Sequence, residues 1–382
     1  MALRSRWMRR WVALVVALLA LVLLVRLHGP APGPAWISAA EAQAPLRHHL
    51  PVSRPSPQGR QAGWRPFPAE APTLRVGLLL KNIYNLDLES QTFSADGWYW
   101  LEWGEDVERL LRSHALDPSK MVEIVNQVET WNGRIEPESA DPESIVDGRR
   151  YQGFRFSGRF SIDAIDMRHS PFENVVLPVV FETRPELFTR ANAAVQLKPD
   201  SHLGSLTGDY SELAGYSLKS NWVVEGQNLY AMSDRHRDEI YSQLTFRVAF
   251  GSQAWPSFMK WILPLLIVMS IVLLAPSLES SLGEMRLAIP STALLTLVFL
   301  QQTYKAELPS TAYLTFLDEL YAYSYLVAVG LFVLFLWASN RMEAAAPEQR
   351  PAVQRSINRI DTLCQWGALL GFGVVSALAW FL

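Results

Sequence analysis

The strongest constraint in this chain of 382 residues is the clustering of apolar residues near its C-terminal end. Four segments there are long enough, or nearly so, to cross about 30 Å of hydrocarbon as helices: Trp255–Ala275, Leu287–Tyr304, Leu320–Ala338 and Leu363–Leu382. A further apolar segment, Trp11–Leu27, follows four arginines near the start. That arrangement predicts a secretory signal peptide or a signal-anchor helix.

The distribution of arginine predicts how the chain crosses the membrane. If the first apolar segment begins in the cytoplasm, residues 28–255 lie outside, and the loop between the last two spans lies inside. That loop carries Arg341, Arg350, Arg355 and Arg359, as the excess of positive charge in cytoplasmic loops requires. The sequence therefore predicts a multi-pass membrane protein whose long middle region faces outward.

Composition excludes several classes of function. Lys and Arg number 34 against 37 Asp and Glu, so the chain lacks the positive charge of a nucleic-acid binder. The single cysteine, Cys364, excludes a disulfide framework and a cysteine-ligated metal. The histidines are scattered, and the chain has no Gly-x-Ser-x-Gly, Walker or His-Glu-x-x-His motif. We therefore expect no catalytic metal, no cofactor and no enzyme activity.

The region before the C-terminal spans divides in two. Residues 29–72 hold ten of the 24 prolines and read as an extended linker after a signal or anchor at 1–28. Residues 73–254 alternate apolar and polar side chains with period two, which predicts an antiparallel β-sandwich of about 180 residues. The clearest alternating runs are Leu74–Leu80, Trp98–Trp103, Phe154–Ile162, Val175–Phe181 and Leu244–Phe250. A helix is expected at Val107–His114. Residues 255–382 then form a four-helix membrane domain.

The second C-terminal segment carries polar residues that a helix facing lipid would avoid. At 100° per residue, Ala288, Thr292, Leu295, Phe299 and Gln302 share one side of the helix. Small and hydroxyl groups at one end, two large apolar groups in the middle and an amide at the other end suit a water-lined pore with an apolar constriction. The alternative is that the small residues let neighbouring helices pack closely.

Several stretches of the chain, in this order and spacing, carry a resemblance to a known family. The most specific runs from Glu284-Met285-Arg286-Leu287 to Leu308-Pro309 and Tyr313-Leu314-Thr315-Phe316-Leu317-Asp318; the others are Leu263-Pro264, Tyr84–Asp87 with Phe93 and Trp103, Ser170–Glu173, and Leu213–Tyr216. Together they resemble the pentameric ligand-gated ion channels, the Cys-loop receptor superfamily, and specifically its bacterial branch without the Cys loop. The resemblance covers about residues 74–382.

The resemblance implies a homopentamer in a bacterial inner membrane, with the β-domain in the periplasm and inorganic ions passing along the fivefold axis. The second C-terminal helix of each copy would line the pore through Glu284, Ala288, Thr292, Leu295, Phe299 and Gln302. Leu295 and Phe299 would then form the apolar gate. Five Glu284 carboxylates at the inner entrance would concentrate cations and repel anions. An ordinary solvated residue favoured by the helix dipole is the alternative for Glu284.

The resemblance also implies how opening is driven. Pro171, Phe172 and the turn at Glu89 would lie against the Leu308-Pro309 loop, and Arg247 would pair with Glu173 or Glu89. The agonist, a small molecule or protons, would bind between subunits. Phe188 and Tyr230 are the candidate aromatic residues there, and they would attract an amine through cation-π contacts. The alternative is that these two rings belong to the ordinary sandwich core or anchor loops.

Two residues depart from the family's pattern. Glu173 stands where aspartate is usual, and Pro290 lies one turn into the expected pore helix, which predicts that this helix begins later than the resemblance suggests. The rival interpretation of the whole chain is a membrane-anchored periplasmic β-sandwich that senses or scaffolds without conducting. In that protein the polar side of the second span would only mediate helix packing.

Overall fold

The computed structural model describes residues 52–53, 71–145, 148–163, 165–184, 195–210, 212–230, 239–278 and 282–381. The predicted signal or anchor helix lies outside these residues, as does the proline-rich linker apart from positions 52–53 and 71–72. The described residues divide into two compact units, one within residues 32–165 and 174–251, and the other formed by residues 166–173 and 252–381. Each unit is described by itself.

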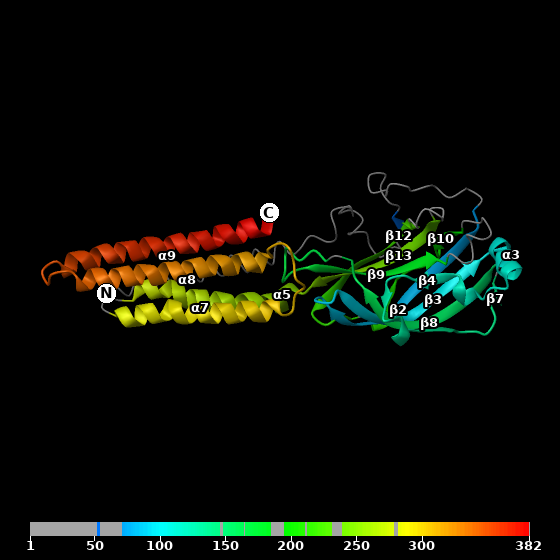
Figure 1. Cartoon of the computed structure of the whole chain (residues 1–382), viewed down its shortest axis with the longest axis horizontal. Coiled ribbons are helices and arrows are strands. Elements are labelled where there is room, and N and C mark those ends of the chain that lie inside the picture. The colour runs from blue at the N-terminus through cyan, green and yellow to red at the C-terminus, as the bar shows by residue number, and fades with distance from the viewer. Residues whose placement is uncertain are drawn as a thin grey trace. The chain divides into compact units, whose positions relative to one another are not determined.

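The first of these units contains two β-sheets (Figure 1). One has the strand order β1-β12-β13-β9-β4, formed by Val52–Ser53, Tyr216–Tyr230, Glu239–Ser252, Asn174–Thr183 and Val122–Ile124. The other has the order β10-β2-β3-β8-β5, formed by Gln196–Pro199, Thr73–Asp87, Thr92–Trp103, Arg150–Ser161 and Gln127–Val128. To this sheet are added β11 (Thr207–Tyr210) beside β2, and β6 (Arg134–Pro137) and β7 (Glu143–Ser144) beside β8.

Alternating burial explains why these segments form strands. Along β3, the side chains of Tyr99, Leu101 and Trp103 are buried, whereas those of Trp98 and Trp100 between them are only partly buried. The buried rings join the two sheets: Tyr99 stacks on Phe154 of β8 at 4.8 Å between centroids and contacts Phe181 of β9 at 5.2 Å. The β-sandwich-like architecture is therefore confirmed.

Two details of this unit differ from the prediction or extend it. The sheets are not wholly antiparallel, because β10 and β11 run parallel to β2, and β1 runs parallel to β12. The expected helix is α3 (Glu105–His114), and it is held against β3 by a hydrogen bond from Trp103 Nε1 to Glu108 Oε2 of 2.9 Å.

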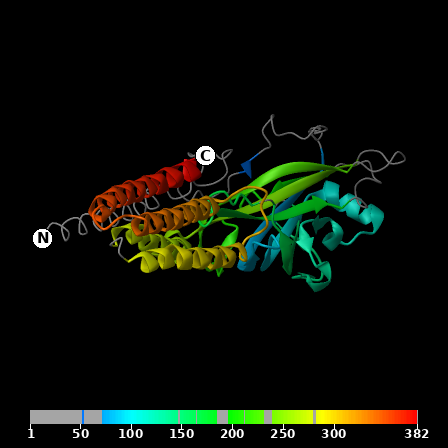
Figure 2. The ribbon, with the colours of Figure 1, turned by 60° about the vertical axis from the view of Figure 1, so that its left-hand side comes forward.

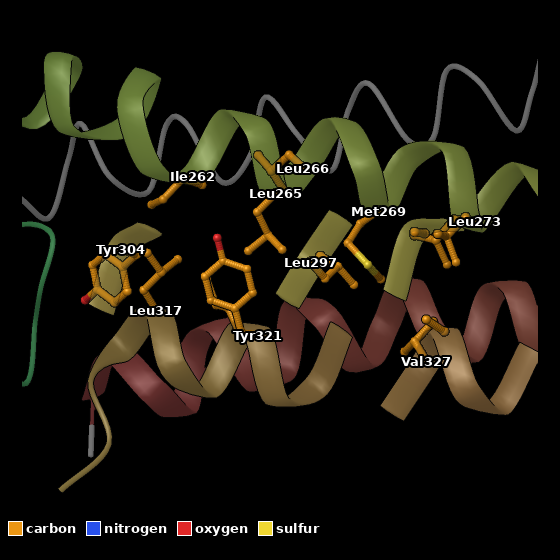
Figure 3. Packing of buried hydrophobic residues seen from close by; sticks show 14 of the residues in the cluster. Ile262, Leu265, Leu266, Met269, Leu273, Leu297, Tyr304, Leu317, Tyr321 and Val327 are labelled. Carbon is orange, nitrogen blue, oxygen red and sulfur yellow. The ribbon is translucent and has the colours of Figure 1, made fainter. Parts of the chain in front are cut away.

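The other unit contains four helices that are long and apolar enough to cross a membrane: Ala254–Ser277, Gly283–Lys305, Phe316–Glu343 and Arg350–Phe381. The first comprises α5 (Ala254–Ser257), a π-helical turn η4 (Phe258–Ile262), α6 (Leu263–Leu274) and a final turn η5 (Ala275–Ser277). The others are α7, α8 and α9, and Figures 1 and 2 show them running alongside one another. Figure 3 shows Leu297 and Tyr304 of α7 among the buried side chains of α6 and α8.

Two helix boundaries correct the sequence analysis. α7 begins at Gly283, not later than the resemblance suggests. Pro290 lies buried inside the helix, which accommodates the loss of one backbone donor there. α9 begins at Arg350, not near Leu363. The sequence analysis placed the start too late because the first turns of α9 carry exposed arginines, which interrupt the apolar pattern. α8 begins with a capping box between Thr315 and Asp318.

Candidate pore-lining helix and coupling loop

The side of α7 that the sequence analysis singled out faces away from the core of its own unit. All six predicted pore-lining residues are exposed: Glu284, Ala288, Thr292, Leu295, Phe299 and Gln302. The two large apolar ones are unusually open, with Leu295 59% and Phe299 64% exposed. The opposite side of the helix packs inward through Arg286, Pro290, Ala293, Leu297 and Tyr304. The polar side of α7 therefore does not mediate packing among the helices that the structure describes.

Hydroxyl groups near this side donate to the helix itself. Ser291 Oγ donates to the Leu287 carbonyl at 2.8 Å, Thr296 Oγ1 to Thr292 at 3.0 Å, and Thr303 Oγ1 to Phe299 at 2.9 Å. Because each hydroxyl proton is used within the helix, the oxygen keeps lone pairs for an outside partner. Such oxygens accept hydrogen bonds from water and attract cations rather than anions.

The exposed faces of the neighbouring helices have a different composition. From residue 363 onward, the large exposed side chains of α9 are apolar: Leu363, Trp366, Leu370, Val374, Leu378 and Phe381. On α8 they include Leu326, Val329 and Val333. These surfaces suit contact with lipid chains, whereas the mixed polar and apolar surface of α7 does not.

The N-terminal end of α7 holds a buried ion pair that the sequence analysis did not anticipate. Arg286 Nη2 lies 2.6 Å from Asp361 Oδ2 on α9, and each side chain is only 2% exposed. The guanidinium also lies over the Phe335 ring of α8, 4.3 Å from its centroid. Glu284, two residues earlier, points to the opposite, exposed side. No local motif connects Arg286 to Asp361, which lies 75 positions further along the chain.

The C-terminal end of α7 is joined to the start of α8 by polar contacts. Lys305 Nζ lies 3.0 Å from Asp318 Oδ2, a carboxylate that is 2% exposed. Gln301 Nε2 donates to the other oxygen of Asp318 at 3.4 Å and its own Oε1 accepts from Tyr325 at 2.7 Å. Tyr304 and Thr315 share a hydroxyl hydrogen bond of 3.1 Å. Because of these contacts, a movement of the start of α8 would also move the last turns of α7.

The segment 166–173, which we call the coupling loop, belongs to the same unit as the helices. Its Arg168 carbonyl accepts from Phe316 N at 2.7 Å, and Met167 N donates to the Tyr313 hydroxyl at 2.9 Å. Phe172 is fully buried in the helical core, and its ring lies 5.9 Å from that of Trp380 on α9. The coupling loop is thus hydrogen-bonded to the connection between α7 and α8.

The predicted coupling residues are found in both units. Pro171 and Glu173 lie in the coupling loop, where their carbonyls accept from Ser252 Oγ and Ser252 N, each at 3.0 Å. In the α7–α8 connection, Pro309 is buried, and Leu308 packs on the helical core. In the β-unit, Glu89 is exposed in the turn after β2, and Arg247 pairs with Asp163 at 3.5 Å. Asp163 was not among the partners expected for Arg247, which were Glu173 and Glu89.

The candidate ligand-binding residues are not described by the structure. Phe188 lies outside the described residues, and Tyr230 ends β12 with a side chain whose placement is also outside them. Among the described residues, no three His, Cys, Asp or Glu side chains gather as a metal site requires.

Comparison of the sequence with models of known protein families, and with curated proteins, gives no match.

Proposed function

We propose that this chain is the subunit of a homopentameric ligand-gated ion channel, selective for cations, in a bacterial inner membrane with its β-domain outside. One observation carries the proposal: α7 presents Ala288, Thr292, Leu295, Phe299 and Gln302 on a surface that the described part of the chain leaves exposed. In a ring of five chains, that surface would face the axis. It combines polar groups that an ion can approach with apolar groups that can exclude water.

The gate of the proposed channel is formed by Leu295 and Phe299. Five copies of each produce two apolar rings, which dewet when the helices approach and admit water when they separate. The exposed hydroxyl and amide groups of Thr292 and Gln302 replace part of the hydration of a passing cation. Glu284 supplies five carboxylates at the inner entrance, where they raise the local concentration of cations.

Opening is driven through the coupling loop. A small ligand or protons acting on the β-domain favour one position of Pro171 and Phe172, and the loop's hydrogen bonds to Tyr313 and Phe316 carry this change to the α7–α8 connection. The ligand shifts the closed and open populations only by the difference between its affinities for the two states.

Replacing Leu295 with serine tests the proposal. The L295S substitution makes one apolar ring polar, and each change of about 1.4 kcal/mol in the gating equilibrium alters the ratio of open to closed channels about tenfold. We expect L295S protein in liposomes to leak sodium without added ligand, by at least that factor above the unmodified protein. The matched control is L370S, which changes another exposed leucine, on the apolar face of α9, and should add no leak.

A rival function predicts a different result. If the chain is a membrane-anchored sensor or scaffold, neither L295S nor L370S produces current, and the purified protein shows no fivefold ring. Both measurements, sodium flux and the subunit number in detergent, are needed, because a pentamer without flux would retain the assembly but refute conduction.

A further inference from the structure

We infer that Asp361 determines the charge selectivity of the pore by neutralising Arg286, so that Glu284 alone sets the charge at the inner entrance. This inference rests on the proposed function and deepens it, because it assigns a selectivity role to a residue that does not touch the ion path. It starts from the buried contact between Arg286 on α7 and Asp361 on α9.

The positions of the charges on α7 make the effect of Asp361 specific. Glu284 and Arg286 are two residues apart in a helix, about 200° around its axis, so they project to opposite sides. Glu284 is exposed, whereas Arg286 is buried with its guanidinium 2.6 Å from the Asp361 carboxylate and over the Phe335 ring. Without Asp361, five guanidinium groups would stand close behind five Glu284 carboxylates and oppose their field.

An ion pair in this position is poorly explained by stability alone. Removing two charges from water is unfavourable, and replacing a buried pair with apolar residues of similar size is often neutral or stabilising. Removing one partner leaves an uncompensated buried charge and is strongly destabilising. If the Arg286–Asp361 pair has only a structural role, single substitutions change stability without changing ion selectivity. If it has an electrostatic role, single substitutions change selectivity and the double substitution restores it.

The other charges near this end of the helical unit do not replace Asp361. Arg341 of α8 lies over the Trp337 ring and is exposed, and Arg350, Arg355 and Arg359 are exposed at the start of α9. Solvent and salt screen such groups far more than a buried pair. Among the described residues, Asp361 is the acidic partner that the ion pairs assign to Arg286.

The test measures the reversal potential of purified channels in planar bilayers under a NaCl gradient, all in the L295S background so that no agonist is needed. D361N should lower the permeability ratio of sodium to chloride by at least about tenfold, because one uncompensated charge about 10 Å from the ion, at an effective dielectric constant near 20, already has an effect of that size and the pentamer adds five. R286Q should raise the ratio instead. The double variant R286Q/D361N should return to the value of the L295S parent.

Each result decides the inference. An unchanged reversal potential in D361N, with lower thermal stability, would assign Asp361 a purely structural role and overturn it. If D361N does not assemble, R286Q and the double variant still test the inference. A fall in the sodium-to-chloride permeability ratio with R286Q would contradict the neutralisation of Arg286 by Asp361. A double variant whose ratio differs from that of the L295S parent would contradict it as well. Absence of current in the L295S parent would refute the proposed function itself, an outcome distinct from current with unaltered selectivity.

Discussion

In the β-unit, the surroundings of the Glu102 carboxyl change its pKa. Glu102 on β3 lies 3.4 Å from Arg149, and Asp200, which accepts a 2.9 Å hydrogen bond from Trp100 Nε1, is a second acidic group nearby. Burial raises the pKa of Glu102 above its ordinary value of 4.5, and the negative charge of Asp200 adds to this shift, although Arg149 opposes it. The folded protein thus holds this proton more tightly than the unfolded chain does.

A pH dependence of stability follows from Glu102. Because its pKa is higher in the folded state, the free energy of unfolding falls as pH rises from about 4.5 through the folded pKa, and it recovers on acidification. We expect E102Q to be more stable than the unmodified protein at neutral pH and to lose this part of the pH dependence. Thermal unfolding of the full chain across that range measures both effects. The control E136Q changes an exposed carboxylate on β6 and should alter stability by no more than about 0.5 kcal/mol.

At the scale of elements, α8 and α9 pack closely at one glycine. A Cβ atom on Gly371 would come within 2.8 Å of Tyr323 Cζ and even closer to its hydroxyl oxygen. That hydroxyl donates to the Ala368 carbonyl at 3.0 Å. A methyl group at 371 therefore displaces the tyrosine and breaks its hydrogen bond to α9.

The G371A substitution tests this packing against two neighbours. We expect G371A to lower the free energy of unfolding by about 1 kcal/mol or more relative to G367A and G373A, reflecting the lost hydrogen bond and the displaced ring. All three variants gain the same helix propensity, and a Cβ at Gly367 or Gly373 meets no atom within 4 Å. Equal melting temperatures for the three variants in detergent would contradict the close contact.

The elements that could be predicted are those whose pattern is local. Alternation of apolar and polar residues, as in Leu74–Leu80, identified strands, and long apolar runs identified the four apolar helices. Both patterns depend only on neighbouring residues in the sequence. The start of α9 was missed because its first turns face water. The partner of Arg286 was missed because the contact joins residues far apart in sequence, and the contact of Arg247 with Asp163 was missed for the same reason.

At the scale of the whole molecule, four apolar helices and a β-unit are compatible with a multi-pass membrane protein. The exposed arginines 341, 350, 355 and 359 all belong to the end of α8 and the start of α9, so their charge marks one end of this helix pair. Such a concentration favours the cytoplasmic side. The β-unit is then predicted to face outward.

Labelling of introduced cysteines checks this orientation. In a C364A background, D141C in the β-unit and E348C between α8 and α9 place single thiols at exposed positions. We expect a membrane-impermeant maleimide to label D141C in spheroplasts and E348C only after the membrane is permeabilised. Labelling of both positions before permeabilisation, or the reverse order, would refute the predicted topology.

The contact between α7 and α9 has a consequence for how the protein is made. Translation delivers the second membrane helix well before residue 361, so a nascent chain contains the Arg286 guanidinium before its counter-charge exists. Until the last helix is inserted, that cation must stay hydrated or point toward lipid headgroups. Chains truncated before the final helix therefore leave Arg286 without its buried counter-charge, and we expect them to be less stable in the membrane than the full chain.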